Sequence, residues 1–319
     1  MAVTLSLVEA ARAIAEDVLF PAARAVDAAD RVPATHLDLL AAQGFYDPPE
    51  DEVARIVEIL ASGCLATTFV WLQHRGGLRE AATSTRPGIR ERWHRPLATG
   101  QRRAGIALGA LRPGSASVRA RRVDGGYVLD GESPWVTGWD MIDTLCAAAR
   151  DERDTVVWAL LDAEAGRGLS VEPLDLVAVR ASRTVLVRFD GYRVADERVT
   201  GAHPYAEWAE RDAAGLRLNG FLALGVAARC VALLGATPLA VALDECRSAL
   251  VSGTPDVAQA RAAAAALAVR AAAALAVTQG AGAVLRGSHA ERLSREALFL
   301  LVFGSRPAIR SALSRRLLY

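Results

Sequence analysis

The sequence predicts a mainly α-helical chain with a small β-domain in its middle. Across residues 1–101 apolar residues recur at helical spacing, as at Val57 and Leu60. Across residues 102–203 short runs of β-branched and apolar residues alternate with polar ones and are separated by turn residues. Residues 204–319 are rich in alanine and leucine with helical periodicity throughout. We therefore expect a helical domain, a β-domain and a helical bundle, with these three ranges as domain boundaries.

Breaker residues place the ends of several expected elements. Gly44 and the run Asp47-Pro48-Pro49 end one helix, and Glu50 begins the next. Ser84–Gly88 forms a loop within the first domain. In the last domain, Thr237-Pro238 and Ser252–Pro255 separate helices that short loops join into a bundle.

The middle domain is expected to be a small β-barrel or sandwich, because its strands are short and regularly spaced. Asp124-Gly125-Gly126 fits the turn of a β-hairpin. The expected strands are Gly105–Leu108, Val118–Val123, Tyr127–Leu129, Thr155–Leu161 and Val185–Phe189.

Composition narrows the class of function. The chain holds 37 basic and 36 acidic residues, for a formal net charge of +1, with arginines spread along its length, so nothing points to nucleic acid. The N-terminus lacks the pattern of a secretory signal, and the alanine-rich run Ala262–Val277 is broken by Arg270 and is short for a membrane span. We expect a cytoplasmic protein that contacts no membrane. The four cysteines have no metal-ligand spacing, so we expect buried, reduced thiols and no metal.

Four stretches resemble acyl-CoA dehydrogenases, and they occur in that family's order across nearly the whole chain. The two in the β-domain resemble the family's "GYVLNGxKxWITN" and "IRASPTxxVxFDxVRVP" segments. The outer two resemble "LAEQGLLG" and "ERLLRDA". In this chain the stretches are Leu37–Phe45, Gly126–Gly131 with Trp135–Gly138, Val179–Thr184 with Val187–Val194, and Glu291–Ala297.

The resemblance implies an acyl-CoA dehydrogenase-like fold and a flavin cofactor, FAD or possibly FMN. It also implies an acyl-CoA or related acyl thioester as substrate. In the family the Trp-Ile-Thr segment lies against the flavin ring, which carries over here to Trp135, Val136 and Thr137. Trp135 would supply packing and Thr137 a hydroxyl and a backbone N–H. Family members assemble through the C-terminal bundle, so we expect a homo-oligomer or a complex with a paralogous subunit.

Other family segments are altered here. The "TEPxAGSD" loop, which binds flavin pyrophosphate and substrate, corresponds to the shortened stretch Ala110–Ser117 without its Thr-Glu pair. Gly114 and Ser115 could still offer N–H groups to a phosphate, and Arg112 could pair with one. An ordinary Pro-Gly turn explains the same residues equally well. The "RxQFGxPI" segment has no clear counterpart.

The family's catalytic base is also missing. Gly304 stands where the family's "IYEGTSEI" segment carries its glutamate, and Leu216–Leu222, where some members hold the base, has no carboxylate. His74 is a weak alternative, since a lone histidine beside an arginine and two glycines is more often structural. Ser305-Arg306 could hold an anion or could form a tight loop. His289 is expected at an interhelical turn.

Three functions remain open from the sequence. The first is a flavin-dependent oxidoreductase of the acyl-CoA dehydrogenase type. The second is a flavin monooxygenase on the same fold, which needs no glutamate base. The third is a non-catalytic subunit that pairs with a complete paralogue, since both the flavin-contact segments and the base are reduced.

Overall fold

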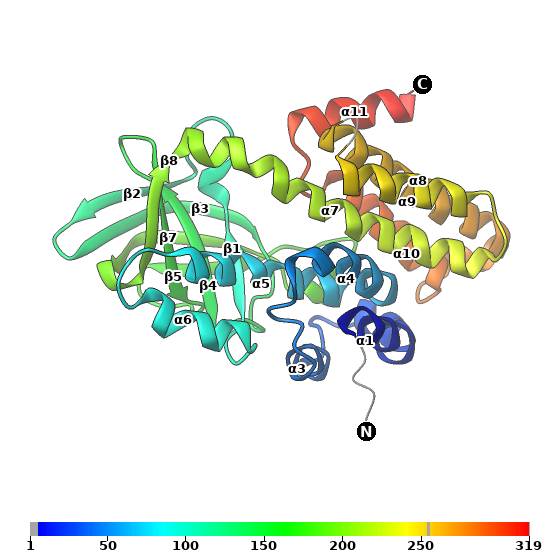
Figure 1. The fold of residues 1–319 in the computed structure, drawn as a ribbon, viewed down its shortest axis with the longest axis horizontal. Helices are drawn as coiled ribbons and strands as arrows, with labels where there is room; N and C mark the ends of the chain where they lie inside the picture. The colour runs from blue at the N-terminus through cyan, green and yellow to red at the C-terminus, as the bar shows by residue number, and fades with distance from the viewer. Residues whose placement is uncertain (1–5, 254–255, 319) are drawn as a thin grey trace.

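The computed structural model describes residues 6–253 and 256–318, and of residues 209–215 the backbone alone. Helices come first, a mixed β-sheet follows, and helices close the chain (Figure 1). The sheet lies at one end of the molecule and the C-terminal helices at the other, while the N-terminal helices lie along one side. The order of elements confirms the predicted fold class.

The described residues of the N-terminal part form six α-helices, and the predicted breakers separate α3 from α4 and α5 from α6. A capping box at Ser6 starts the first, with reciprocal bonds between Ser6 and Glu9. Three acidic residues in the first turn of α4 favour its N-terminus, and the helix begins at Glu50 as predicted. The bounds are α1 Leu7–Ile14, α2 Phe20–Ala28, α3 Ala34–Ala42, α4 Glu50–Gly63, α5 Leu65–Thr83 and α6 Ile89–Ala98, with a π-helical segment at Ala15–Leu19 between α1 and α2.

One mixed sheet of eight strands forms the middle of the chain. Its strands pair in the order β6-β7-β3-β2-β4-β5-β8, and β1 pairs with β4 in parallel. The predicted hairpin joins β2 to β3, with Val123 opposite Gly126. The bounds are β1 Ala104–Ala107, β2 Val118–Val123, β3 Gly126–Val136, β4 Thr144–Arg150, β5 Thr155–Asp162, β6 Leu169–Pro173, β7 Val185–Ala195 and β8 Val199–Pro204.

The two faces of β4 and β5 pack against different partners. On one face, Leu145, Ala147 and Ala149 join apolar residues of the other strands in a core enclosed by the sheet. On the other face, Cys146 and Ala148 pack against α5 and α6. Because both faces are covered, every residue of β4 is buried.

Five helices form the C-terminal part, and α7 links it to the sheet. α7 runs directly on from β8 into the bundle (Figure 1), where it packs on α4 and α9. A Cβ at Gly225 of α7 would lie 2.5 Å from the Glu58 carbonyl oxygen, so glycine allows the close approach of α7 to α4. The bounds are α7 Tyr205–Leu234, α8 Leu239–Ser252, α9 Val257–Gln279, α10 His289–Val302 and α11 Pro307–Leu318. Of the second predicted break in this bundle, residues 254–255 lie outside the described part of the chain.

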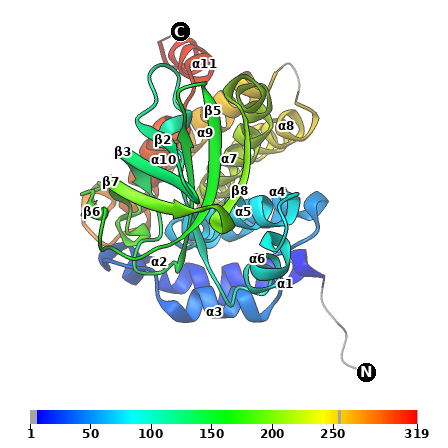
Figure 2. The same cartoon turned by 90° about the vertical axis from the view of Figure 1, so that its left-hand side faces the viewer.

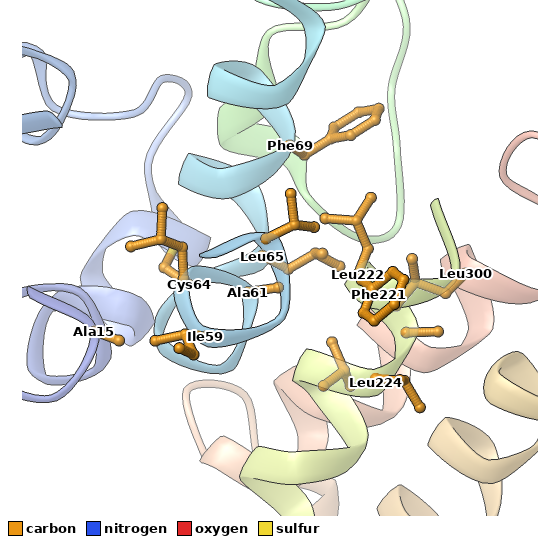
Figure 3. Close-up of a cluster of buried hydrophobic side chains, with 14 of the residues drawn as sticks. Ala15, Ile59, Ala61, Cys64, Leu65, Phe69, Phe221, Leu222, Leu224 and Leu300 are labelled. Atoms are coloured by element: carbon orange, nitrogen blue, oxygen red, sulfur yellow. The ribbon is translucent and has the colours of Figure 1, made fainter. Parts of the chain in front are cut away.

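One hydrophobic core joins the N-terminal helices to the C-terminal bundle. Leu65 of α5, Leu222 of α7 and Leu300 of α10 are all fully buried in it. Figure 3 shows side chains from these helices meeting in one cluster, and Figure 2 shows the helices stacked behind the sheet. The sheet and the bundle are thereby held by a shared set of helices.

Two helices of the C-terminal part are long and apolar for a bundle. Two described segments, Leu216–Leu234 and Val257–Val284, are long and apolar enough to cross a bilayer by length and composition. The second is longer than the alanine-rich run considered in the sequence, because the helix continues on both sides of it. In each, 56% of the apolar window is buried within the protein, which is typical of the core helices of a bundle.

Candidate functional site

Two segments that are far apart in the sequence are joined by backbone hydrogen bonds at one edge of the sheet. The Gly138 N–H donates to the Ser182 carbonyl at 2.9 Å, and the Trp139 N–H donates to the Arg183 carbonyl at 3.1 Å. An ion pair between the side chains of Arg183 and Asp140, at 3.0 Å, closes the same junction. The segments 135–140 and 179–184, which carry the family resemblance, therefore form one structural unit, here called the paired turns.

The paired turns concentrate backbone strain. Five non-glycine residues of the described chain have positive φ, and four of them lie here, namely Trp135, Asp140, Val179 and Arg183. Such conformations cost about 1–3 kcal/mol each and persist only where the surrounding structure enforces them. A β-branched residue at positive φ, as at Val179, is a pronounced outlier. Strain of this kind gathers at functional sites.

Trp135 is held away from the protein by this strained backbone. Its φ is 67°, and 52% of the residue is exposed. The two residues that follow, Val136 and Thr137, are 0% and 1% exposed. A large aromatic ring is thus presented to the outside from a rigid, buried base, although burial of that ring would be favourable.

Thr137 uses its hydroxyl inside the protein. Its Oγ1 lies 3.2 Å from Oγ1 of Thr184, which in turn lies 2.8 Å from Oγ of Ser182. All three hydroxyls are buried, so this chain of hydrogen bonds ties the two turns together. The Thr137 hydroxyl, which the resemblance assigns to the cofactor, is thus hydrogen-bonded to Thr184 in the protein.

The shortened loop lies beside the strand that carries Trp135. The Glu132 N–H donates to the Ser117 carbonyl at 2.8 Å, and the Gly109 N–H donates to Oγ of Ser133 at 3.0 Å. Arg150, 5% exposed, donates to the Gly114 carbonyl and so holds the tip of the loop. The loop that carries the exposed Ser115 is thus bonded to the stretch of β3 that leads to Trp135.

The side-chain amide of Asn219, from α7, lies beside Gly304. Gly304 has a φ of 60°, and a Cβ added there would lie 2.9 Å from Nδ2 of Asn219. Asn219 belongs to the stretch of α7 that was considered in the sequence as the alternative location of a base. The two positions therefore face each other, and neither carries a carboxylate.

Arg261 holds the end of the helix that leads to Gly304. Its Nη2 donates to the carbonyls of Leu300 and Phe303, at 3.1 Å each, in the last turn of α10. The guanidinium is 1% exposed, and burial lowers the pKa of Arg261 to about 10. Sequence reasoning missed this residue because an arginine within an alanine-rich helix looks like a surface residue.

One turn of α5 connects the paired turns to the Gly304 turn. Cγ1 of Val70 would lie 3.5 Å from a Cβ at Gly138. The neighbouring residue, Phe69, packs edge-on against Phe303, with 4.8 Å between ring centroids. Phe69 projects from α5 in Figure 3. A single turn of α5 therefore lies between the paired turns and the turn that holds Gly304.

His74 lies in a packed environment. Its Nδ1 accepts a hydrogen bond from the Ala104 N–H at 3.0 Å, and its ring meets Tyr46 edge-on. Burial lowers the pKa of His74 to about 3, helped by the charges of Arg75 and Arg103. With its Nδ1 lone pair engaged and the residue 2% exposed, the geometry favours a structural role for His74.

The remaining candidates lie at helix ends. Arg306 stacks over Trp208, with its Cζ 5.7 Å from the ring centroid, and Oγ of Ser305 is buried. His289 stacks on Phe20 at 4.4 Å between centroids, and burial lowers its pKa to about 4, as do nearby arginines. Among the side chains of the described residues, no cluster of three His, Cys, Asp or Glu could hold a metal ion.

The architecture places a mixed sheet between N-terminal and C-terminal helices, with the paired turns where β3 ends and β7 begins. Comparison with solved structures identifies the fold class. The glutaryl-coenzyme A dehydrogenase glutaryl-CoA complex matches with a TM-score of 0.84 and 16% identity, covering 100% of this chain and 97% of that one. The FAD complex of PigA matches with a TM-score of 0.81 and 18% identity, covering 99% of both chains.

Sequence comparison points the same way. A mitochondrial 2-methylacyl-CoA dehydrogenase of Solanum tuberosum is 26% identical over an alignment of 149 residues that covers 44% of this chain. The match spans only 36% of that relative's length. No protein-family model matches the chain. The chain has the fold of the acyl-CoA dehydrogenase superfamily, which confirms the resemblance carried by its motifs.

Proposed function

We propose that this protein is a flavin-dependent oxidoreductase of the acyl-CoA dehydrogenase type, with an acyl-CoA or related acyl thioester as substrate. The observation that carries the proposal is the exposed Trp135 on the strained, hydrogen-bonded paired turns. A flat aromatic face on a rigid base is what a planar cofactor needs for stacking. The fold and the FAD complex of a protein with the same fold support this assignment.

The residues present fit the isoalloxazine ring of FAD better than they fit its phosphates. Trp135 would pack against the isoalloxazine ring, while the buried Val136 and Thr137 would keep water from the far side. Arg112 and Ser115, exposed on the loop beside β3, would lie toward the phosphates. When bound, the flavin supplies two-electron chemistry that protein side chains lack. The short loop offers fewer contacts to the phosphates, so FMN stays a second candidate.

A second function, flavin monooxygenation on the same fold, is favoured by the Gly304 turn. Removal of a substrate α-proton by a positioned base contributes roughly 10²–10⁴-fold to rate. Here Gly304 faces Asn219, whose carboxamide does not accept a proton at neutral pH. Chemistry that uses reduced flavin and oxygen needs no such base.

An anaerobic titration distinguishes the two functions. The protein is loaded with FAD, octanoyl-CoA is added, and the flavin absorbance near 450 nm is followed. Bleaching by octanoyl-CoA supports dehydrogenation. Reduction that occurs only with NADH and a separate flavin reductase, followed by oxygen-dependent product, supports monooxygenation. A chain that takes up no flavin alone, but does so with a paralogous subunit, would contradict both and support the non-catalytic reading.

A further inference from the structure

A groove of about 520 Å³ lies in the C-terminal bundle, away from the paired turns. α8 and α11 both pack on α9 (Figure 1), and residues of all three helices line the groove. Its floor is made by Ala263, Ala266 and Leu267 of α9, and Ala242 of α8 forms part of one wall. Small side chains leave this space open, and its volume is within the ~300–1,000 Å³ typical of sites for small ligands.

Two arginines at the groove have no acidic partner among the described residues. Arg270 of α9 and Arg316 of α11 both line it, and neither forms an ion pair or a hydrogen bond with another described residue. Most other arginines near the bundle are paired, as Arg247 is with Glu58 and Arg295 with Asp27. The two guanidiniums are therefore available to an anion.

Charge and shape together define the ligand. Glu245 also lines the groove, so two positive charges and one negative charge leave a net charge of +1. That balance suits a group with a single negative charge better than a dianionic phosphate. The apolar floor, extended by the exposed Leu317, suits a hydrocarbon chain.

Cys246 also lines the groove, so the reactivity of its thiol can be used to detect a bound ligand. The thiol is free and half-buried, whereas the other three cysteines are buried. Burial raises the pKa of the Cys246 thiol, and the charges of Arg316 and Arg270 act on it in the opposite direction. The two arginines are thus near enough to this thiol for a bound ligand to shield it.

We propose that this groove binds a single-chain fatty carboxylate, with its head group between Arg270 and Arg316 and its chain over the alanines of α9. This site is separate from the flavin site and does not depend on the proposed reaction. It assigns a ligand-binding function to the bundle of the full chain.

Protection of Cys246 from a maleimide tests the proposal. Decanoate should slow labelling of Cys246 in the wild-type protein, while 1-decanol, which has the same chain and no charge, should protect at least about tenfold less well. Arg270→Gln with Arg316→Gln should weaken decanoate protection at least about tenfold. Arg121→Gln, an exposed arginine of β2, is the matched control and should leave protection unchanged. Ala266→Phe should abolish protection by filling the groove while both arginines remain.

Several results would overturn the proposal. Equal protection by decanoate and 1-decanol would remove the role of the arginines, and tighter binding of decyl phosphate would contradict the carboxylate. Labelling that depends on protein concentration but not on decanoate would mean that a second copy covers the groove. Flavin content, measured in the same samples, should not change with the groove variants, so failure here is distinguishable from failure at the flavin site.

Discussion

At the scale of single residues, the candidate site is defined by conformations that side chains ordinarily avoid. Trp135 and Val179 hold positive φ without being glycine, and Gly304 holds a φ of 60°. The first two place strain where a ligand would bind. The last leaves space that Asn219 takes up.

Gly304→Glu is expected to destabilise the protein. A glutamate at a φ of 60° enters the left-handed region at about 1–2 kcal/mol, and its Cβ must displace Asn219. Urea unfolding of the variant should show this loss, and adding Asn219→Ala should recover the steric part only. If flavin is bound, the double variant should dehydrogenate acyl-CoA faster than wild type. A Gly304→Glu variant as stable as wild type would contradict the described turn.

The pH dependence of stability should report on His74. Its pKa falls to about 3 in the folded protein, so the unfolded chain takes up the proton first as pH decreases. The stabilisation is complete above about pH 6.5 and is lost as pH falls from there toward 3. Between pH 7 and pH 5 this residue should account for about 2 kcal/mol of lost unfolding free energy.

His74→Gln is the matching variant, because its amide oxygen can accept the hydrogen bond from Ala104. Urea unfolding at pH 7 and pH 5 should show a smaller difference in the variant than in wild type. His289, whose pKa is lowered to about 4, adds a dependence of the same sign, which His289→Gln separates. An unchanged difference in His74→Gln would mean that His74 is not buried as described.

At the scale of elements, the paired turns depend on a short chain of buried hydroxyls. Thr184 has two partners, Thr137 and Ser182, whereas Thr137 has only Thr184 among the described residues. Thr137→Val should therefore lower the unfolding free energy by about 1 kcal/mol, the net contribution of one hydrogen bond. Thr184→Val should lower it further, because two buried hydroxyls lose their shared partner. Equal losses would contradict this arrangement.

The sequence predicts these elements unevenly, and the reasons are physical. β2 and the hairpin turn were predicted because one face of β2 is exposed and its apolar and polar residues alternate. β4 was missed because both its faces are buried, so Thr144–Arg150 shows no alternation. β3 extends further than predicted, through two bulges toward Trp135, and β7 continues beyond its predicted end to Ala195, opposite the start of β3.

The site was predicted where it depends on residue type and missed where it depends on contacts. Trp135 and Gly304 could be singled out from the motif. Elements brought together only by folding produce the strain at Val179, the hydrogen bond between Thr137 and Thr184 and the approach of Asn219 to Gly304. Valine is common in strands, so the local sequence gives no sign that Val179 has a left-handed backbone.

At the scale of the whole molecule, the alanine-rich helix α9 packs within the C-terminal bundle. Ala264, Ala268 and Ala271 of α9 are fully buried within the chain, so this face is not free for a partner. Two exposed apolar residues of α10, Leu298 at 52% and Val302 at 68%, lie one helical turn apart on the same face. We propose that the protein self-associates, or pairs with a paralogue, through this face.

Sedimentation velocity tests this assembly. Wild type should sediment as a dimer or larger species, and Leu298→Asp with Val302→Asp should shift it toward monomer because two carboxylates would be buried. Val251→Asp, a change at a 62% exposed valine of α8, is the matched control and should leave the assembly intact. A wild-type protein that is monomeric at every working concentration, both alone and with a paralogue, would contradict the proposal.

Flavin binding by the purified full chain tests the central claim most directly. After incubation with excess FAD and removal of free cofactor, absorbance near 450 nm should show close to one flavin per chain. Trp135→Ala should lower that occupancy, Trp135→Phe should retain most of it, and both variants should unfold at the wild-type temperature or slightly above it. Absence of flavin from wild type, or equal occupancy in Trp135→Ala, would contradict the assignment of the paired turns as the flavin site.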